Sequence, residues 1–151
     1  MTSKKLLEML RKHHITYRPE DFTALITRII EHAKIVRKDG ILKIEKDIQD
    51  EKNYLYRKLM GMALDGVDSE VVKRVGDTYI KNVEGYLTAR DRELKVPAGE
   101  IERLLRQMRM VVEAVHMIQN GFIPYLIEEM LFMYVLGEAR PASRFKQGDS
   151  L

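Results

Sequence analysis

Cysteine is absent from this 151-residue sequence. Its absence excludes a disulfide framework, a zinc site with thiolate ligands and a cysteine nucleophile, and it fits a reducing compartment. The excess of one charge is also small, because 26 basic and 23 acidic residues leave a net charge of only +3. Nucleic-acid-binding proteins usually show a more concentrated basic excess. The composition therefore favours a cytoplasmic protein that does not bind nucleic acid.

A long apolar run is missing as well. The longest segment without a charged residue extends from Ala114 to Ile127, whereas a transmembrane helix needs about 20 apolar residues. Near the N-terminus, Glu8 and Arg11 stand where a signal peptide requires an apolar core. We therefore expect neither a membrane span nor a secretion signal in this chain.

Sequence motifs for enzyme chemistry are missing too. The chain has no glycine-rich phosphate loop, no serine-histidine-acid order and no convincing carboxylate pair. His13 and His14 would point about 100° apart on a helix and could not easily share one metal ion, while His32 and His116 are isolated. We therefore expect no enzyme activity, no small-molecule substrate, no cofactor and no metal site.

Apolar residues instead recur at steps of three and four, the spacing of amphipathic helices. The pattern predicts a short first helix ending near His13, a long helix from Pro19 to Gly40, and short helices on either side of residue 50. Asp68 is a suitable N-cap for a further long helix. The predicted buried stripe of that helix contains Val72, Val75, Tyr79, Val83 and Tyr86.

The second half of the chain predicts a helical hairpin. A turn at 97–99 separates the Asp68 helix from a stripe with the same spacing between Ile101 and Ile118, which should end at Gly121. Pro124 to Leu136 should form the last helix, followed by a frayed tail from Pro141. Since alternation with a period of two is nowhere sustained, we expect an all-α bundle. Residues 1–151 would form a single domain, with several short helices packed on a long antiparallel hairpin.

Three stretches of the sequence carry a resemblance to a known family. Residues 33–45, AKIVRKDGILKIE, place a basic residue three positions before a glycine and a glutamate five positions after it. Residues 64–72, LDGVDSEVV, contain aspartate-glycine followed by an aspartate and a glutamate. Residues 118–129, IQNGFIPYLIEE, are followed by Arg140-Pro141. In this order, the stretches resemble cytoplasmic segments of MotA-type flagellar stator subunits, in the MotA/TolQ/ExbB proton channel family.

The resemblance has a specific extent. Residues 20–95 resemble the MotA cytoplasmic loop and residues 108–145 its C-terminal cytoplasmic segment, with the turn near 97–99 joining them. Members of the family have two membrane helices before the first stretch and two between the second and third, and none of these helices is present here. The chain is either a natural soluble relative or one whose membrane hairpin was removed. In both cases the resemblance implies no ion conduction by this chain alone.

The resemblance also implies a function and a binding surface. Arg37 and Glu45 would face opposite charges on the C-terminal domain of the FliG-type rotor switch protein, at the inner face of the inner membrane. Other MotA copies and MotB would complete the stator. The same surface would include Lys34, Lys38, Lys46 and Asp47. On one continuous helix Arg37 and Glu45 would lie about 80° apart, although a kink at Gly40 would change this. The alternative to a rotor contact is that these residues only form a solvated charged surface.

Other interpretations stay open at this point. The chain could be a soluble helical adaptor that regulates motor assembly, or a basic helical DNA-binding regulator. Basic residues alternate with acids along every predicted helix, which disfavours the regulator. Residues 130–135 could also form an exposed patch that docks to a second copy. Because the family assembles largely through membrane helices, we expect a monomer or weak self-association.

Overall fold

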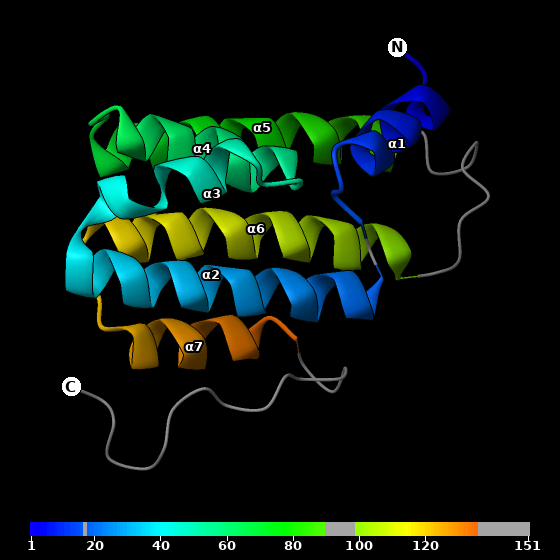
Figure 1. Cartoon of the computed structure of the whole chain (residues 1–151). Coiled ribbons are helices and arrows are strands. Elements are labelled where there is room, and N and C mark those ends of the chain that lie inside the picture. Colours follow the sequence, from blue (N-terminus) through cyan, green and yellow to red (C-terminus); the bar gives the residue numbers. More distant parts are fainter. Residues whose placement is uncertain (17, 90–98, 136–151) are drawn as a thin grey trace.

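The computed structural model describes residues 1–16, 18–89 and 99–135. These residues form helices joined by short turns, with no strand in the described ranges, so the predicted all-α fold is confirmed (Figure 1). The elements are α1 (Ser3–Lys12), α2 (Pro19–Asp39), the 3-10 helix η1 (Ile41–Ile44), α3 (Glu45–Gln49), α4 (Tyr54–Leu64), α5 (Ser69–Ala89), α6 (Glu100–Gln119) and α7 (Pro124–Met133).

Local sequence signals explain most helix ends. Pro19 occupies the first turn of α2, where its missing N–H has no helical partner. The Asn53 side chain accepts a hydrogen bond from the N–H of Tyr56, and that of Asp68 accepts one from the N–H of Glu70. Gly40 ends α2 with φ of 89°, a conformation that glycine adopts without steric cost. The segment after Gly40 was predicted as one short helix and forms two, η1 and α3.

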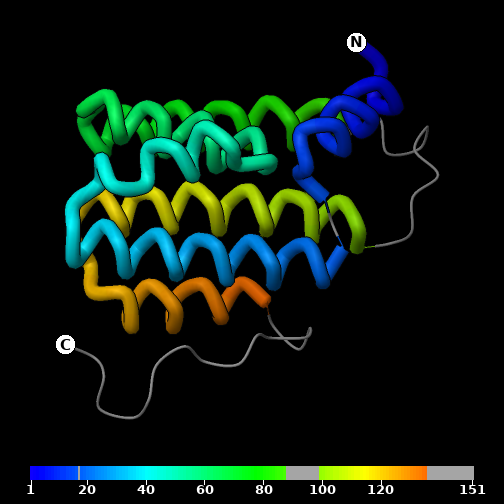
Figure 2. The backbone as a smooth tube through the Cα atoms, in the orientation of Figure 1, coloured from blue at the N-terminus to red at the C-terminus, as the bar shows by residue number. Residues whose placement is uncertain are grey.

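Helix α6 is the central element of the bundle. It contacts α2, α4, α5 and α7, and the backbone trace in Figure 2 shows α5 and α7 running antiparallel to it. The predicted pairing of α5 with α6 is therefore confirmed. Of the predicted turn between them, only Gly99 is described, and it precedes α6 in a left-handed conformation with φ of 87°. Pro97 and Ala98 lie outside the described residues.

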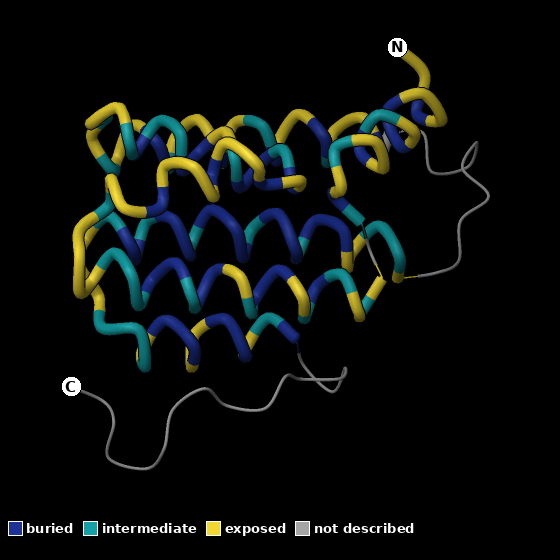
Figure 3. The backbone as a smooth tube through the Cα atoms, in the orientation of Figure 1, coloured by how far each residue is buried: buried dark blue, intermediate teal, exposed yellow. Residues whose placement is uncertain are grey.

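The hydrophobic core contains residues from every helix, and the faces turned toward α6 are buried (Figure 3). The predicted stripe of α6 is confirmed from Leu104 to Ile118, and the stripe of α2 is buried from Phe22 to Ala33. No helix in the described ranges combines the length and apolar character needed to cross a membrane. Helix α7 ends at Met133, and the predicted helix end at Leu136 and the tail from Pro141 lie outside the described residues.

The buried face of α5 differs from the predicted stripe. Val75 and Tyr86 were expected in the core and are 38% and 41% exposed, whereas Ile80 and Leu87 are buried. The reason is a close helix contact at Gly76, where an added Cβ atom would lie 2.5 Å from Cγ2 of Val112 on α6. The side of α5 that carries Gly76 packs against α6. The buried face of the helix is therefore rotated relative to the stripe of larger apolar residues that the sequence predicted.

Candidate functional site

Arg37 lies in the last turn of α2, at the end of the bundle where α6 also ends. Its side chain is exposed, and its Nη1 donates a hydrogen bond to the backbone oxygen of Gly121 at 2.9 Å. This carbonyl belongs to the turn between α6 and α7, whose Gly121 has φ of 73°. Arg37 therefore fastens the end of α2 to this turn and still presents positive charge to solvent.

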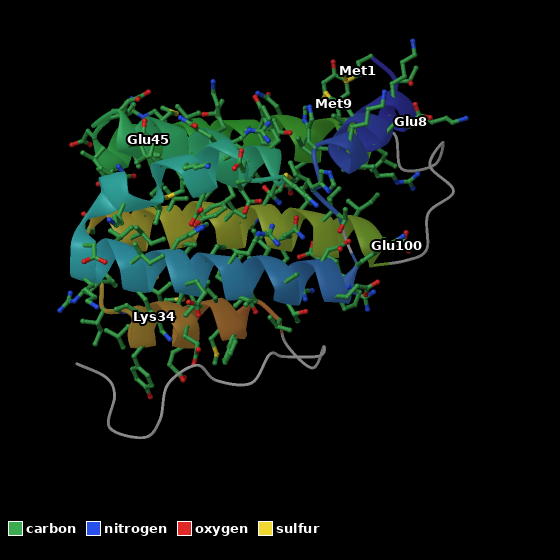
Figure 4. The ribbon with its side chains drawn as sticks, in the orientation of Figure 1. Met1, Glu8, Met9, Lys34, Glu45 and Glu100 are labelled. Carbon is green, nitrogen blue, oxygen red and sulfur yellow. The ribbon has the colours of Figure 1, made fainter. Side chains whose placement is uncertain are left out.

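Glu45 begins α3 and is exposed. Since Gly40 ends α2, Arg37 and Glu45 do not share a continuous helix, and the 80° separation does not apply. Figure 4 labels Glu45 on the α3 side of α2 and Lys34 on the α7 side. Two of the six residues predicted for the rotor contact therefore lie on different sides of α2, and the six do not form one compact patch.

The remaining predicted contact residues differ in their surroundings. Lys38 and Lys46 are exposed, and Lys34 is half-buried. The Asp47 carboxylate lies 3.8 Å from Nε2 of His32, which connects this acid to a polar cluster in the interior. The assignment of these residues to a rotor contact stays a prediction.

The three stretches that resemble MotA segments meet at this end of the bundle, on the left in Figure 1. The hydrogen bond from Arg37 to Gly121 joins the first stretch to the third. Gln119 Nε2 donates to the backbone oxygen of Val67 at 3.0 Å, which joins the third stretch to the second. Segments far apart in the sequence are therefore held together by side-chain to backbone hydrogen bonds.

An apolar pocket of about 260 Å³ opens beside Arg37. Among the described residues that line it, Arg37 is the only charged one, and the others are Ala33, Val36, Ile118, Gly121, Phe122 and Ile127. The pocket therefore combines an apolar surface with a single cationic group. That combination suits an apolar side chain of a partner with a carboxylate next to it.

A buried polar cluster that the sequence analysis missed connects α2 to the loop before α4. Glu51, whose side chain is 2% exposed, accepts two hydrogen bonds from Arg28, at 2.7 Å from Nε and 3.0 Å from Nη2. Its Oε2 also accepts from the backbone N–H of Asn53 at 2.8 Å. These bonds outweigh the effect of burial, which by itself raises a carboxyl pKa, and the pKa of Glu51 is lowered.

His32 extends the same cluster into the core. Its Nδ1 lies 2.8 Å from the hydroxyl of Tyr56, a fully buried side chain whose pKa burial raises well above its usual value. Burial lowers the pKa of His32, and the nearby carboxylates of Asp47 and Glu51 oppose this only in part. A cleft of about 410 Å³ next to the cluster has both acidic and basic side chains in its wall. The cluster therefore favours a structural role, with neutral His32 inside the fold.

Acid is expected to destabilise the protein in two steps through this cluster. The pKa of His32 is lower in the folded protein than its unfolded value of 6.5. Its contribution to the stability of the fold is therefore complete above pH 6.5 and is lost as the pH falls through the folded-state pKa. The contribution of Glu51 is likewise complete above its unfolded value of 4.5 and is lost at lower pH. Thermal melts between pH 7.5 and 5 should show a falling Tm, and His32→Gln should flatten that fall.

The control for this prediction is His14→Asn, which changes an exposed histidine at φ of 55°, a conformation that asparagine tolerates. This variant should keep the pH dependence of the wild-type chain. An unchanged slope in His32→Gln would contradict the assignment of the first acid step to His32.

Histidines elsewhere in the described ranges have other neighbours. His13 stacks on Tyr54 with ring centroids 4.4 Å apart, and His116 lies 3.8 Å from a carboxylate oxygen of Glu70. Among the residues that the structure describes, no group of three histidine, aspartate or glutamate side chains is placed to hold a metal ion.

No protein-family model matches this chain, and no significant match exists to a curated protein or a solved structure.

Proposed function

We propose that this chain is the cytoplasmic part of a flagellar stator subunit of the MotA type, and that it transmits torque by contacting the C-terminal domain of the rotor switch protein. The observation that carries the proposal is the meeting of the three MotA-like stretches at one end of the bundle. Their meeting supports the proposal because it places the residues that carry the resemblance next to one another at one end of the bundle. In this proposal the chain is not an enzyme and conducts no ions alone.

The charges at this end suit a contact that forms and releases repeatedly. Arg37, Lys38 and Glu45 are exposed, and exposed charges steer association and orientation more than they add affinity. An adaptor that regulates motor assembly would use the same surface, and differs from this proposal only in its cellular role.

The charge pattern elsewhere supports a protein partner more than DNA. Lys73 lies 3.5 Å from Asp77, and Arg109 lies 3.1 Å from Glu84 and 3.8 Å from Glu102. A DNA-binding helix needs basic side chains that are available to phosphates. Binding to random duplex DNA with a steep salt dependence would favour the regulator over the stator function.

The proposed contact predicts that Arg37→Glu weakens binding to the rotor switch domain about tenfold at low salt, as measured by titration calorimetry. A reversed charge turns attraction into repulsion, and about 1.4 kcal/mol corresponds to a factor of ten. The loss should shrink as salt rises, because charges separated by more than about 8 to 10 Å are screened at physiological ionic strength. Reversing the facing acid on the rotor domain should restore part of the affinity.

A second variant separates binding from stability. Arg37→Gln removes the charge but keeps an N–H donor for the backbone oxygen of Gly121. We expect it to melt close to the wild-type Tm and to lose part of the affinity. If Arg37→Glu unfolds the chain and Arg37→Gln binds like wild type, Arg37 has a structural role only and the rotor contact lies elsewhere.

A further inference from the structure

Helix α7 is apolar on both its inner and its outer face. Ile127, Leu131 and Phe132 are buried against the bundle, and so is one of the two acids of the helix, Glu128. The outer face carries Leu126, Met130 and Met133, which are 47%, 39% and 54% exposed. Glu129, which is also exposed, stands three residues after Leu126 and four before Met133, so this outer face combines apolar side chains with one carboxylate. The outer face of α7 therefore has the composition of a contact surface.

This outer face continues into the pocket beside Arg37. Phe122, which lines the pocket, is 46% exposed and stands four residues before Leu126. Nine large hydrophobic residues of the described ranges are exposed, and four of them form this one row. We call Phe122, Leu126, Met130 and Met133 the α7 row. It begins at the cationic pocket and follows the helix away from the end of the bundle.

We propose that the α7 row and the Arg37 pocket together bind an amphipathic helix of the partner, one whose apolar face carries a carboxylate opposite Arg37. This inference rests on the proposed function and places the apolar half of the rotor contact on α7. Helices that bind in this way insert apolar anchors at steps of three and four, and Leu126, Met130 and Met133 recur at the same steps along α7. Methionine side chains adapt to different shapes, which suits a partner that moves past the surface.

The small area of the α7 row favours a transient partner over a stable interface with a second copy of the chain. Arg37 lines the pocket at one end of the row, and Glu129 stands on α7 itself. Of the described residues that line the pocket, Arg37 alone is charged, and its guanidinium attracts a carboxylate. Four half-exposed side chains offer on the order of 300 to 400 Å², well below the roughly 800 Å² per partner of a stable interface. The row alone is therefore suited to a transient contact.

The test measures binding of the full-length chain to the purified C-terminal domain of the rotor switch protein. The variant is the double substitution Leu126→Gln and Met133→Gln, and its matched control is Val71→Gln and Val75→Gln on α5, where both valines are also exposed. The α7 variant should bind about tenfold more weakly than wild type. Its loss should persist at high salt, unlike that of Arg37→Glu, and the α5 control should bind like wild type.

Three results would overturn the inference. If the α7 variant binds like wild type while Arg37→Glu weakens binding, the α7 row is not part of the contact and the proposed function stands. If wild type does not bind the rotor domain at all, both proposals fail. If wild type self-associates in sedimentation equilibrium and the α7 variant does not, the row binds a second copy.

Discussion

Glu51→Ala is expected to lower the free energy of unfolding by about 2 to 3 kcal/mol. The substitution leaves the Asn53 N–H without its acceptor and removes both carboxylate bonds of Arg28. Breaking a fully buried ion pair typically costs about 3 to 5 kcal/mol, and the lower figure applies because the Arg28 side chain is 43% exposed and can turn to water. For a chain of this size the Tm should fall by about 5 to 10 °C.

The matched control is Glu45→Ala, which removes an exposed glutamate from the start of α3, six residues earlier in the chain. It should change the free energy of unfolding by about 0.5 kcal/mol or less. Chemical denaturation monitored by circular dichroism measures both variants. Equal, small effects would mean that the loop before α4 rearranges and that the Glu51 cluster does not hold α2 in place.

Gly76→Ala is expected to destabilise the protein by about 1 to 3 kcal/mol, although alanine normally favours a helix over glycine by about 1 kcal/mol. The added methyl group would lie 2.5 Å from Val112 Cγ2 and 3.1 Å from Leu59 Cδ1, so α5 must move away from α6. Steric overlap between packed helices costs more than the gain in helix propensity. Thermal melts of the purified variant provide the measurement.

Gly85 in the same helix serves as the control, because a Cβ atom added there meets nothing within 4 Å. Gly85→Ala should stabilise the chain by about 0.5 to 1 kcal/mol. Combining Gly76→Ala with Val112→Ala should cost less than the sum of the two single effects, since Val112→Ala removes the atom that the new methyl group overlaps and that methyl group fills part of the space left by Val112→Ala. Strict additivity would show that the two residues are not in steric contact.

Part of the candidate site could be expected from the sequence. The charges of Arg37 and Glu45 were identified as surface residues, and Gly40 as a stop or kink between them. The bond from Arg37 to Gly121 could not be predicted, because the partners are separated by 84 positions and a backbone carbonyl leaves no sequence signal. The Glu51 cluster was missed for a similar reason, since its polar segment reads as an ordinary loop. The close contact at Gly76 could not be predicted either, because Gly85 in the same helix meets nothing within 4 Å and the two glycines look alike in the sequence.

The sequence by itself determined the helical class, the approximate ends of the helices and the buried faces of α2 and α6. These features depend on local physics: the 3.6-residue period of apolar side chains, capping by Asp68 and the helix end at Gly40. Only the tertiary structure decided the rotation of α5, the burial of Glu51, the meeting of the three MotA-like stretches and the exposed α7 row. Each depends on which helix packs against which face, and such contacts join residues whose separation along the chain leaves no periodic trace.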